Sequence, residues 1–137
     1  MEKVIFDTSL AVKWFFPESG RDKALDLKNQ HLAGRIKLCT RDLFLYEIVS
    51  SFRNCVREKI EEEDWLLAVK ALQALRLEII PLSYEELDEL FVFSRKLGIS
   101  VYDCSYVLLA KRLKAPLYTA DKKLYLKAKN LVTCFLI

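Results

Sequence analysis

Short apolar runs alternate with longer amphipathic segments along the whole chain of 137 residues. The short runs are rich in β-branched and aromatic residues and are bounded by polar residues, glycine or proline. They predict strands at 4–6, 36–40, 79–80, 117–119 and 132–137. In the longer segments apolar residues recur every three or four positions, as on one face of a helix. They predict helices at 10–16, 21–32, 43–56, 61–75, 83–96 and about 102–113, and a short helix that begins at 120–121.

This alternation predicts the α/β class. Neighbouring parallel strands need right-handed crossovers, which helices provide, so we expect a mostly parallel sheet covered by helices on both faces. In such open sheets the ligand crevice lies beyond the carboxyl ends of the strands, where the strand order reverses. With 53% hydrophobic and 30% charged residues, the chain has the composition of one globular domain with a substantial core.

Four acidic residues stand where this topology can bring them together. Asp7 follows the first predicted strand and Asp121 the fourth, while Glu47 and Asp103 lie on helices. If the first and fourth strands are neighbours, these acids meet at one edge of the sheet. Each acid also has a simpler interpretation, since Asp is a preferred helix cap, an acid in the first turn suits the helix dipole, and Glu47 can be a solvated flank of its helix. The joint placement is what favours a site.

Crowded carboxylates need a cation or a proton. Two of them about 4 Å apart repel by roughly 4 kcal/mol at an effective dielectric constant of 20. Oxygen ligands favour Mg²⁺ or Mn²⁺, and a zinc site is disfavoured because the chain has one histidine, His31, and no C-x-x-C pair. A cation that orients water and neutralises phosphate is the usual route to phosphodiester cleavage without a histidine base.

The charge and the remaining composition set weaker limits. A net charge of +3 permits a nucleic-acid partner without requiring one. Candidate phosphate contacts are Lys13, Arg41, Lys111, Lys122 and Lys123, although an ordinary solvated surface explains any single one of them. The four cysteines allow 3 pairings, but their apolar neighbours favour buried thiols. No run approaches the roughly 20 apolar residues of a membrane span, and no secretory signal is evident, so we expect no membrane partner and a cytoplasmic location.

Four segments together resemble those of a PIN domain, most closely the VapC-like toxins. They are VIFDTS at 4–9, YE at 46–47, VYDCSY at 101–106 with LLA at 108–110, and LYTADKKL at 117–124. The resemblance extends from Val4 to the final strand. The two C-terminal motifs are the most specific part, because strand, threonine and acid recur in order.

The resemblance implies a three-layer α/β/α fold with a five-stranded parallel sheet, formed by one nuclease domain over 1–137, and a Mg²⁺- or Mn²⁺-dependent ribonuclease activity. It assigns the metal site to Asp7, Glu47, Asp103 and Asp121. Asp7 and Asp103 are the expected direct ligands, Thr119 supplies a hydroxyl that steadies the site, and Ser9 is a further helper. Some members carry another acid two positions after the last one; here Lys123 stands there, which puts a second metal in doubt.

The leading hypothesis is therefore an endoribonuclease that is the toxin of a toxin and antitoxin pair, with RNA as substrate and a VapB-like antitoxin as partner. The resemblance also implies a homodimer, for which Trp65 and the leucine-rich helices around it are the candidate face. One alternative is a catalytically silent PIN module that binds RNA or protein. Another is a phosphoryl-accepting receiver or phosphatase, against which the absence of a D-x-D motif after the first strand argues.

Overall fold

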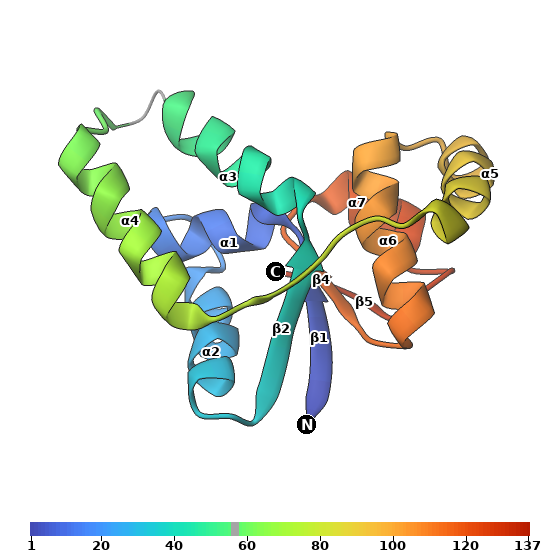
Figure 1. Cartoon of the computed structure of the whole chain (residues 1–137), viewed down its shortest axis with the longest axis horizontal. Coiled ribbons are helices and arrows are strands. Elements are labelled where there is room, and N and C mark those ends of the chain that lie inside the picture. Colours follow the sequence, from blue (N-terminus) through green and yellow to red (C-terminus); the bar gives the residue numbers. More distant parts are fainter. Residues whose placement is uncertain (56–57) are drawn as a thin grey trace.

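The computed structural model describes residues 1–55 and 58–137 and contains a five-stranded sheet with the order β3-β2-β1-β4-β5, in which every pair is parallel (Figure 1). The strands are β1 (Glu2–Phe6), β2 (Ile36–Arg41), β3 (Glu78–Ile80), β4 (Leu117–Thr119) and β5 (Cys134–Leu136). From β1 the chain moves outward to β2 and β3, then returns to the other side of β1 for β4 and β5. The strand order therefore reverses between β1 and β4.

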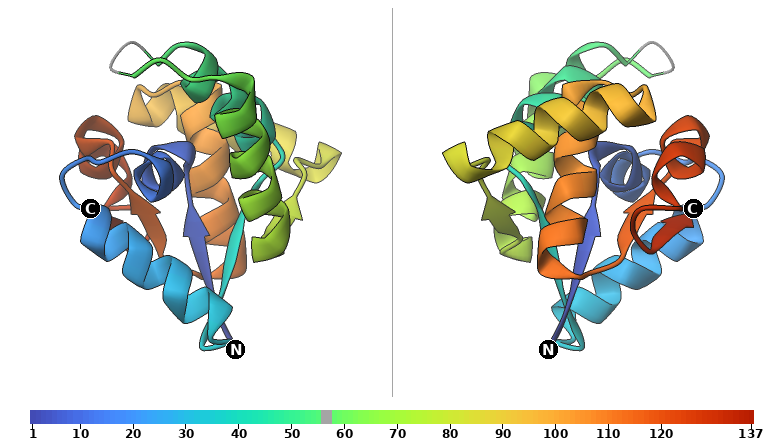
Figure 2. Two further views of the ribbon diagram at one scale, coloured as in Figure 1. Left: turned by 90° about the vertical axis from the view of Figure 1, so that its left-hand side faces the viewer. Right: turned by 90° about the vertical axis from the view of Figure 1, so that its right-hand side faces the viewer.

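Helices cover both faces of this sheet. They are α1 (Thr8–Phe15), α2 (Arg21–Leu32), α3 (Leu43–Arg53), α4 (Glu62–Leu75), α5 (Leu87–Leu97), α6 (Val101–Leu113) and α7 (Lys122–Ala128), with a 3₁₀ turn at Tyr84–Glu86. Helices α1 to α4 lie on one side of the sheet and α5 to α7 on the other, as the two side views in Figure 2 show. Val56, the last residue of the apolar face predicted for 43–56, lies outside the described residues.

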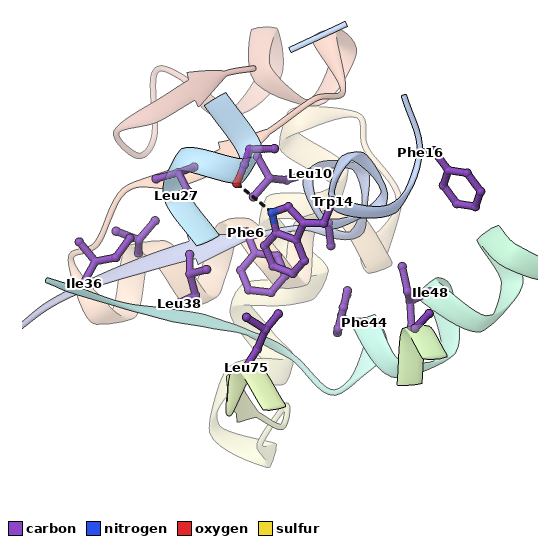
Figure 3. Packing of buried hydrophobic residues seen from close by; sticks show 14 of the residues in the cluster. Phe6, Leu10, Trp14, Phe16, Leu27, Ile36, Leu38, Phe44, Ile48 and Leu75 are labelled. Atoms are coloured by element: carbon purple, nitrogen blue, oxygen red, sulfur yellow. Dashed lines mark hydrogen bonds between the residues drawn. The ribbon is translucent and has the colours of Figure 1, made fainter. Parts of the chain in front are cut away.

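Alternation along β1 divides the core into two clusters. Val4 and Phe6 point into the cluster beneath α1 to α4, and Ile5 points into the cluster beneath α6 and α7, because successive strand residues face opposite sides. Figure 3 shows Trp14 packed over Phe6 in the first cluster, with its indole nitrogen donating to the carbonyl oxygen of Ala24 at 2.9 Å. Trp14 is thus a core residue, as its helical spacing favours.

Some elements begin or end at residues other than the predicted ones, because strand pairing and helix capping decide these ends. β1 begins at Glu2, because Glu2 and Lys3 pair with β2 although both are charged. α1 begins at Thr8, one residue after its cap Asp7. β5 is shorter than 132–137, since only Cys134–Leu136 pairs with β4. The four cysteines are free thiols; Cys39 and Cys104 are buried as predicted, whereas Cys55 and Cys134 are half-buried.

Gly20 provides a test of packing at the C-terminus. It has φ +82°, and a Cβ there would lie 2.9 Å from Cγ2 and 3.2 Å from the carbonyl carbon of Ile137. Gly34 has φ +76° with nothing within 4 Å of such a Cβ. We expect Gly34→Ala to lower the free energy of unfolding by about 1 kcal/mol through backbone strain alone. Gly20→Ala should lower the free energy of unfolding by about 1–3 kcal/mol more than Gly34→Ala does, because the added Cβ overpacks against Ile137. Urea denaturation measures both losses. Equal losses would mean that Ile137 moves aside at no cost.

Candidate active site at the carboxyl edge of the sheet

Asp7 is the centre of the candidate site. β1 ends at Phe6, which pairs with Tyr118 of β4, so the next residues along the two strands, Asp7 and Thr119, are neighbours. The predicted adjacency of the first and fourth strands is therefore confirmed. Asp7 is 5% exposed and caps α1 by accepting a hydrogen bond from the Leu10 amide at 3.3 Å. The same side chain thus both caps α1 and belongs to the candidate site.

Two hydroxyl groups hold the Asp7 carboxylate. Ser9 Oγ donates to Asp7 Oδ1 at 2.6 Å, and Thr119 Oγ1 donates to Asp7 Oδ2 at 2.6 Å. The same hydroxyls accept from the loop after β4, where Ala120 N–H donates to Ser9 Oγ at 2.8 Å and Asp121 N–H to Thr119 Oγ1 at 3.0 Å. The loops that follow β1 and β4 are thereby tied together around the Asp7 side chain.

Burial raises the pKa of Asp7 from 3.8 to about 6. The hydrogen bonds from Ser9, Thr119 and Leu10 act in the opposite direction but do not outweigh it, and the charge of Asp103 raises the pKa further. A negative charge at this position is therefore costly in the unliganded protein. A cation placed beside the carboxylate would relieve that cost.

Asp103 and Asp121 approach from two helix starts. Asp103 is half-buried in the first turn of α6, where Ser100 Oγ accepts from its amide at 3.0 Å. Burial raises the pKa of Asp103, and the charges of Asp121 and Glu47 raise it further. Asp121 caps α7 by accepting from the Leu124 amide at 3.1 Å. Asp103 thus interacts electrostatically with each of the other three acids.

Glu47 is held by Thr8 and Tyr106, for which the sequence predicts no role at the site. Thr8 Oγ1 donates to Glu47 Oε1 at 2.9 Å, and Tyr106 OH donates to the same oxygen at 2.5 Å. By helical spacing alone, Tyr106 is an apolar position of α6. Its spacing of three residues from Asp103 was the available signal, because residues three apart share a helix face.

The donor chemistry suits Mg²⁺ or Mn²⁺, since carboxylates and hydroxyls are oxygen ligands and the carboxylates repel one another without a cation. Within residues 1–55 and 58–137, no three His, Cys, Asp or Glu side chains are grouped closely enough to hold a metal ion. A magnesium site needs fewer, because Mg²⁺ commonly takes one or two carboxylates and keeps several waters. The residues therefore fit a hydrated cation better than an all-protein cage.

The structure revises the predicted RNA contacts. Arg41 is 1% exposed, and its guanidinium binds Glu86, the carbonyl of Ser105 at 2.9 Å and the carbonyl of Pro81 at 3.3 Å. Arg41 as a phosphate contact is thus wrong, because a buried and fully engaged guanidinium cannot reach a ligand.

Lys13 and Lys111 are also engaged. Lys13 is buried and donates to the carbonyl of Ser19 at 2.5 Å, and Lys111 pairs with Glu89 at 2.9 Å. Lys122 and Lys123 are exposed in the first turn of α7, directly after Asp121. The positive charge of Lys123 acts on Asp103 and opposes the rise of its pKa. These two lysines are the predicted contacts that keep an accessible position near the acids.

Comparison with known proteins agrees with this arrangement. A family model described as the PIN domain matches residues 4–130, so the chain belongs to the PIN domain family. It is 28% identical over 133 residues to Ribonuclease VapC3 of Pyrobaculum aerophilum, covering 96% of this chain and 98% of that protein. The PIN resemblance of the sequence motifs is thereby confirmed.

Solved structures confirm the fold. VapBC2 from Rickettsia felis, bound to a promoter DNA fragment, matches with a TM-score of 0.69 at 19% identity over 98% of each chain. FitAcB from Neisseria gonorrhoeae matches with a TM-score of 0.67 at 13% identity over 96% of each chain. The predicted α/β class with a five-stranded parallel sheet is confirmed. Among the described residues, no helix has both the length and the hydropathy to cross a bilayer.

Proposed function

We propose that this chain is an endoribonuclease that requires Mg²⁺ or Mn²⁺ and acts as the toxin of a toxin and antitoxin pair. The observation that carries the proposal is the electrostatic interaction of Asp103 with buried Asp7, with Glu47 and with Asp121 at the switch point of the sheet. Membership of the PIN family and the similarity to a protein named ribonuclease VapC3 support RNA as the substrate. The proposal extends the family assignment to a reaction and its cofactor.

The hydrogen bonds of Asp7 indicate which of its oxygens binds the cation. Oδ1 accepts from Ser9 and from the Leu10 amide, which uses both of its lone pairs. Oδ2 accepts from Thr119 and keeps one lone pair with respect to the described residues. We therefore assign Oδ2 as the ligand atom and Thr119 as the residue that orients it.

Asp103 completes the proposed pair of direct ligands. It is half-buried, and its charge interacts with that of Asp7 from across the site. When bound, the cation supplies Lewis acidity toward water and the phosphate group. Glu47 and Asp121 orient water through hydrogen bonds, and Lys122 and Lys123 bind the phosphates of the RNA. Because Lys123 stands where some PIN domains carry another acid, we propose that the site binds one cation and not two.

The proposed partner is a VapB-like antitoxin. The similar structures include assemblies named VapBC2 and FitAcB. We extend to this chain the association with an antitoxin, and a homodimer as its active form. Trp65 packs edge-on against Phe52 with ring centroids 4.9 Å apart, so the exposed neighbours Leu66 and Leu67 are the better candidates for a dimer face on α4.

The test is RNA cleavage by Asp103→Asn beside a matched control, Asp88→Asn. Both acids lie in the first turn of a helix, α6 and α5 respectively, so both substitutions remove the same helix-dipole interaction. We expect Asp103→Asn to cut cleavage of single-stranded RNA in Mg²⁺ by on the order of 100-fold or more, because cation stabilisation of the transition state is worth several kcal/mol. Asp88→Asn should cleave as the wild type does.

Three outcomes would contradict parts of this proposal. Equal cleavage by Asp103→Asn and the wild type would exclude the assigned ligand. Cleavage that survives chelation of divalent cations would exclude the cofactor. Cation binding without cleavage of any RNA would favour the silent binding module.

A further inference from the structure

A buried cluster of three side chains joins three helices behind the acids. Thr8 is the first residue of α1, Glu47 lies on α3 and Tyr106 lies on α6. Tyr106 is 1% exposed and Thr8 is also buried, whereas Glu47 is half-buried and reaches the edge of the site. The cluster therefore connects a core residue of α6 to a carboxylate of the proposed active site.

The hydrogens of this cluster can be counted. Tyr106 OH lies 2.5 Å from Glu47 Oε1, Thr8 Oγ1 lies 2.9 Å from the same oxygen, and the two hydroxyls lie 3.2 Å apart. Each hydroxyl has one hydrogen. Three arrangements satisfy this count: both hydroxyls donate to Glu47, Thr8 donates to Tyr106 while Tyr106 donates to Glu47, or Tyr106 donates to Thr8 while Thr8 donates to Glu47. The third leaves no hydrogen between Tyr106 OH and Glu47 Oε1, and two oxygens 2.5 Å apart need a hydrogen between them. Tyr106 therefore donates to Glu47, and the length of this bond is that of a bond to a charged acceptor.

This geometry makes the two carboxylate oxygens of Glu47 unequal. Oε1 faces both hydroxyls, and Oε2 is bonded to none of the residues that the structure describes. A phenylalanine at position 106 would fill the same core without a hydroxyl to remove from water, and burying an unpaired hydroxyl is costly. The phenolic oxygen is thus better explained by its contact with Glu47 than by packing.

We propose that Tyr106 is a positioning residue that, with Thr8, holds Glu47 so that Oε2 alone is presented to the waters of the cation. The proposal rests on the function proposed above. Side chains behind a ligand set its orientation and supply part of the binding free energy, because the carboxylate is then ordered before the cation arrives. Asp103 and Tyr106 share one face of α6, so one helix supplies an acid and the residue that orients another.

The test is a double-mutant cycle of Tyr106→Phe and Glu47→Gln, read by calorimetric titration of Mn²⁺ into RNA-free protein. We expect Tyr106→Phe to weaken Mn²⁺ binding roughly 10- to 100-fold. In the Glu47→Gln background the same substitution should have no further effect, because Tyr106 acts through Glu47. Tyr118→Phe is the control, since it removes a hydroxyl from a half-buried ring on β4. It should leave the affinity unchanged.

The outcomes separate this role from a structural one. Equal weakening by Tyr106→Phe in both backgrounds would overturn the proposal, as would unchanged Mn²⁺ affinity in the single variant or no Mn²⁺ binding by the wild type. Thr8→Val provides a second variant and should weaken binding in the same direction but less. Because the titration contains no RNA, a wild type that binds Mn²⁺ but cleaves nothing would refute the proposed function alone.

Discussion

Asp7→Asn should stabilise the protein at pH 8 by about 3 kcal/mol in metal-free buffer, although it removes a proposed metal ligand. Burial raises the pKa of Asp7 from 3.8 to about 6, and each pKa unit corresponds to about 1.36 kcal/mol. The folded protein holds this proton more tightly than the unfolded chain does. The contribution of Asp7 to stability is therefore fully present below pH 3.8 and is lost as the pH rises through about 6.

Urea denaturation from pH 4 to pH 8 in the presence of a chelator measures this effect. The difference in unfolding free energy between Asp7→Asn and the wild type should be near zero at pH 4 and should grow to its plateau above pH 6. Asp88→Asn, an exposed acid on α5, should show no such rise. A pH-independent difference for Asp7→Asn would show that the buried carboxylate carries no such cost.

Added Mg²⁺ should reverse the order of stability. A ligand that binds only the folded state stabilises it by RT ln(1 + [L]/Kd). The wild type should therefore gain stability with rising Mg²⁺ at pH 8, and Asp7→Asn should gain little. The proposed site thus lowers the stability of the metal-free protein and binds a cation in return, and such a loss of stability is common at functional sites.

Arg41→Met should destabilise the protein by about 3–5 kcal/mol at pH 7, the usual cost of breaking one side of a buried ion pair. The pair links the end of β2 to the turn before α5, and the side chains of Arg41 and Glu86 are 1% and 6% exposed. Burial raises the pKa of Glu86, but the hydrogen bonds from Arg41 and Ser83 outweigh it, so the net pKa lies below 4.5. Without the guanidinium, Glu86 is left as a buried charge.

The pH dependence and a surface pair provide the controls. In the wild type, the contribution of Glu86 is present above pH 4.5 and is lost as the pH falls through its lowered pKa. The loss caused by Arg41→Met should therefore shrink toward acidic pH. Adding Glu86→Leu should recover much of the lost unfolding free energy.

Lys111→Met breaks the half-exposed pair with Glu89 and should lower the unfolding free energy by less than about 1 kcal/mol in the same denaturation assay. Similar losses for Arg41→Met and Lys111→Met would contradict the argument.

Local sequence was sufficient for the elements because each depends on contacts along the chain. Apolar spacing predicts β4 at 117–119, where the structure has Leu117–Thr119, and a helix at 21–32, where the structure has α2 at Arg21–Leu32. Local sequence was insufficient for the predicted phosphate contacts Lys13 and Arg41, because the burial of a charged side chain depends on which distant residues bind it. Arg41 is a charged residue at the end of a strand, a position at which the sequence predicts exposure. Only its contacts with the distant residues Glu86 and Ser105 make it a core residue.

The amino-acid sequence by itself determined the alternation of strands and helices, the positions of Asp7, Asp103 and Asp121 at strand ends and helix starts, and the place of Glu47 on a helix, since periodicity and capping are local properties. Tertiary structure alone decided which atoms meet. The parallel register of β1 and β4 brings Thr119 to Asp7, and the packing of α1, α3 and α6 brings Thr8 and Tyr106 to Glu47. These bonds join residues 39 to 112 positions apart, and such separations leave no periodic signal in the chain.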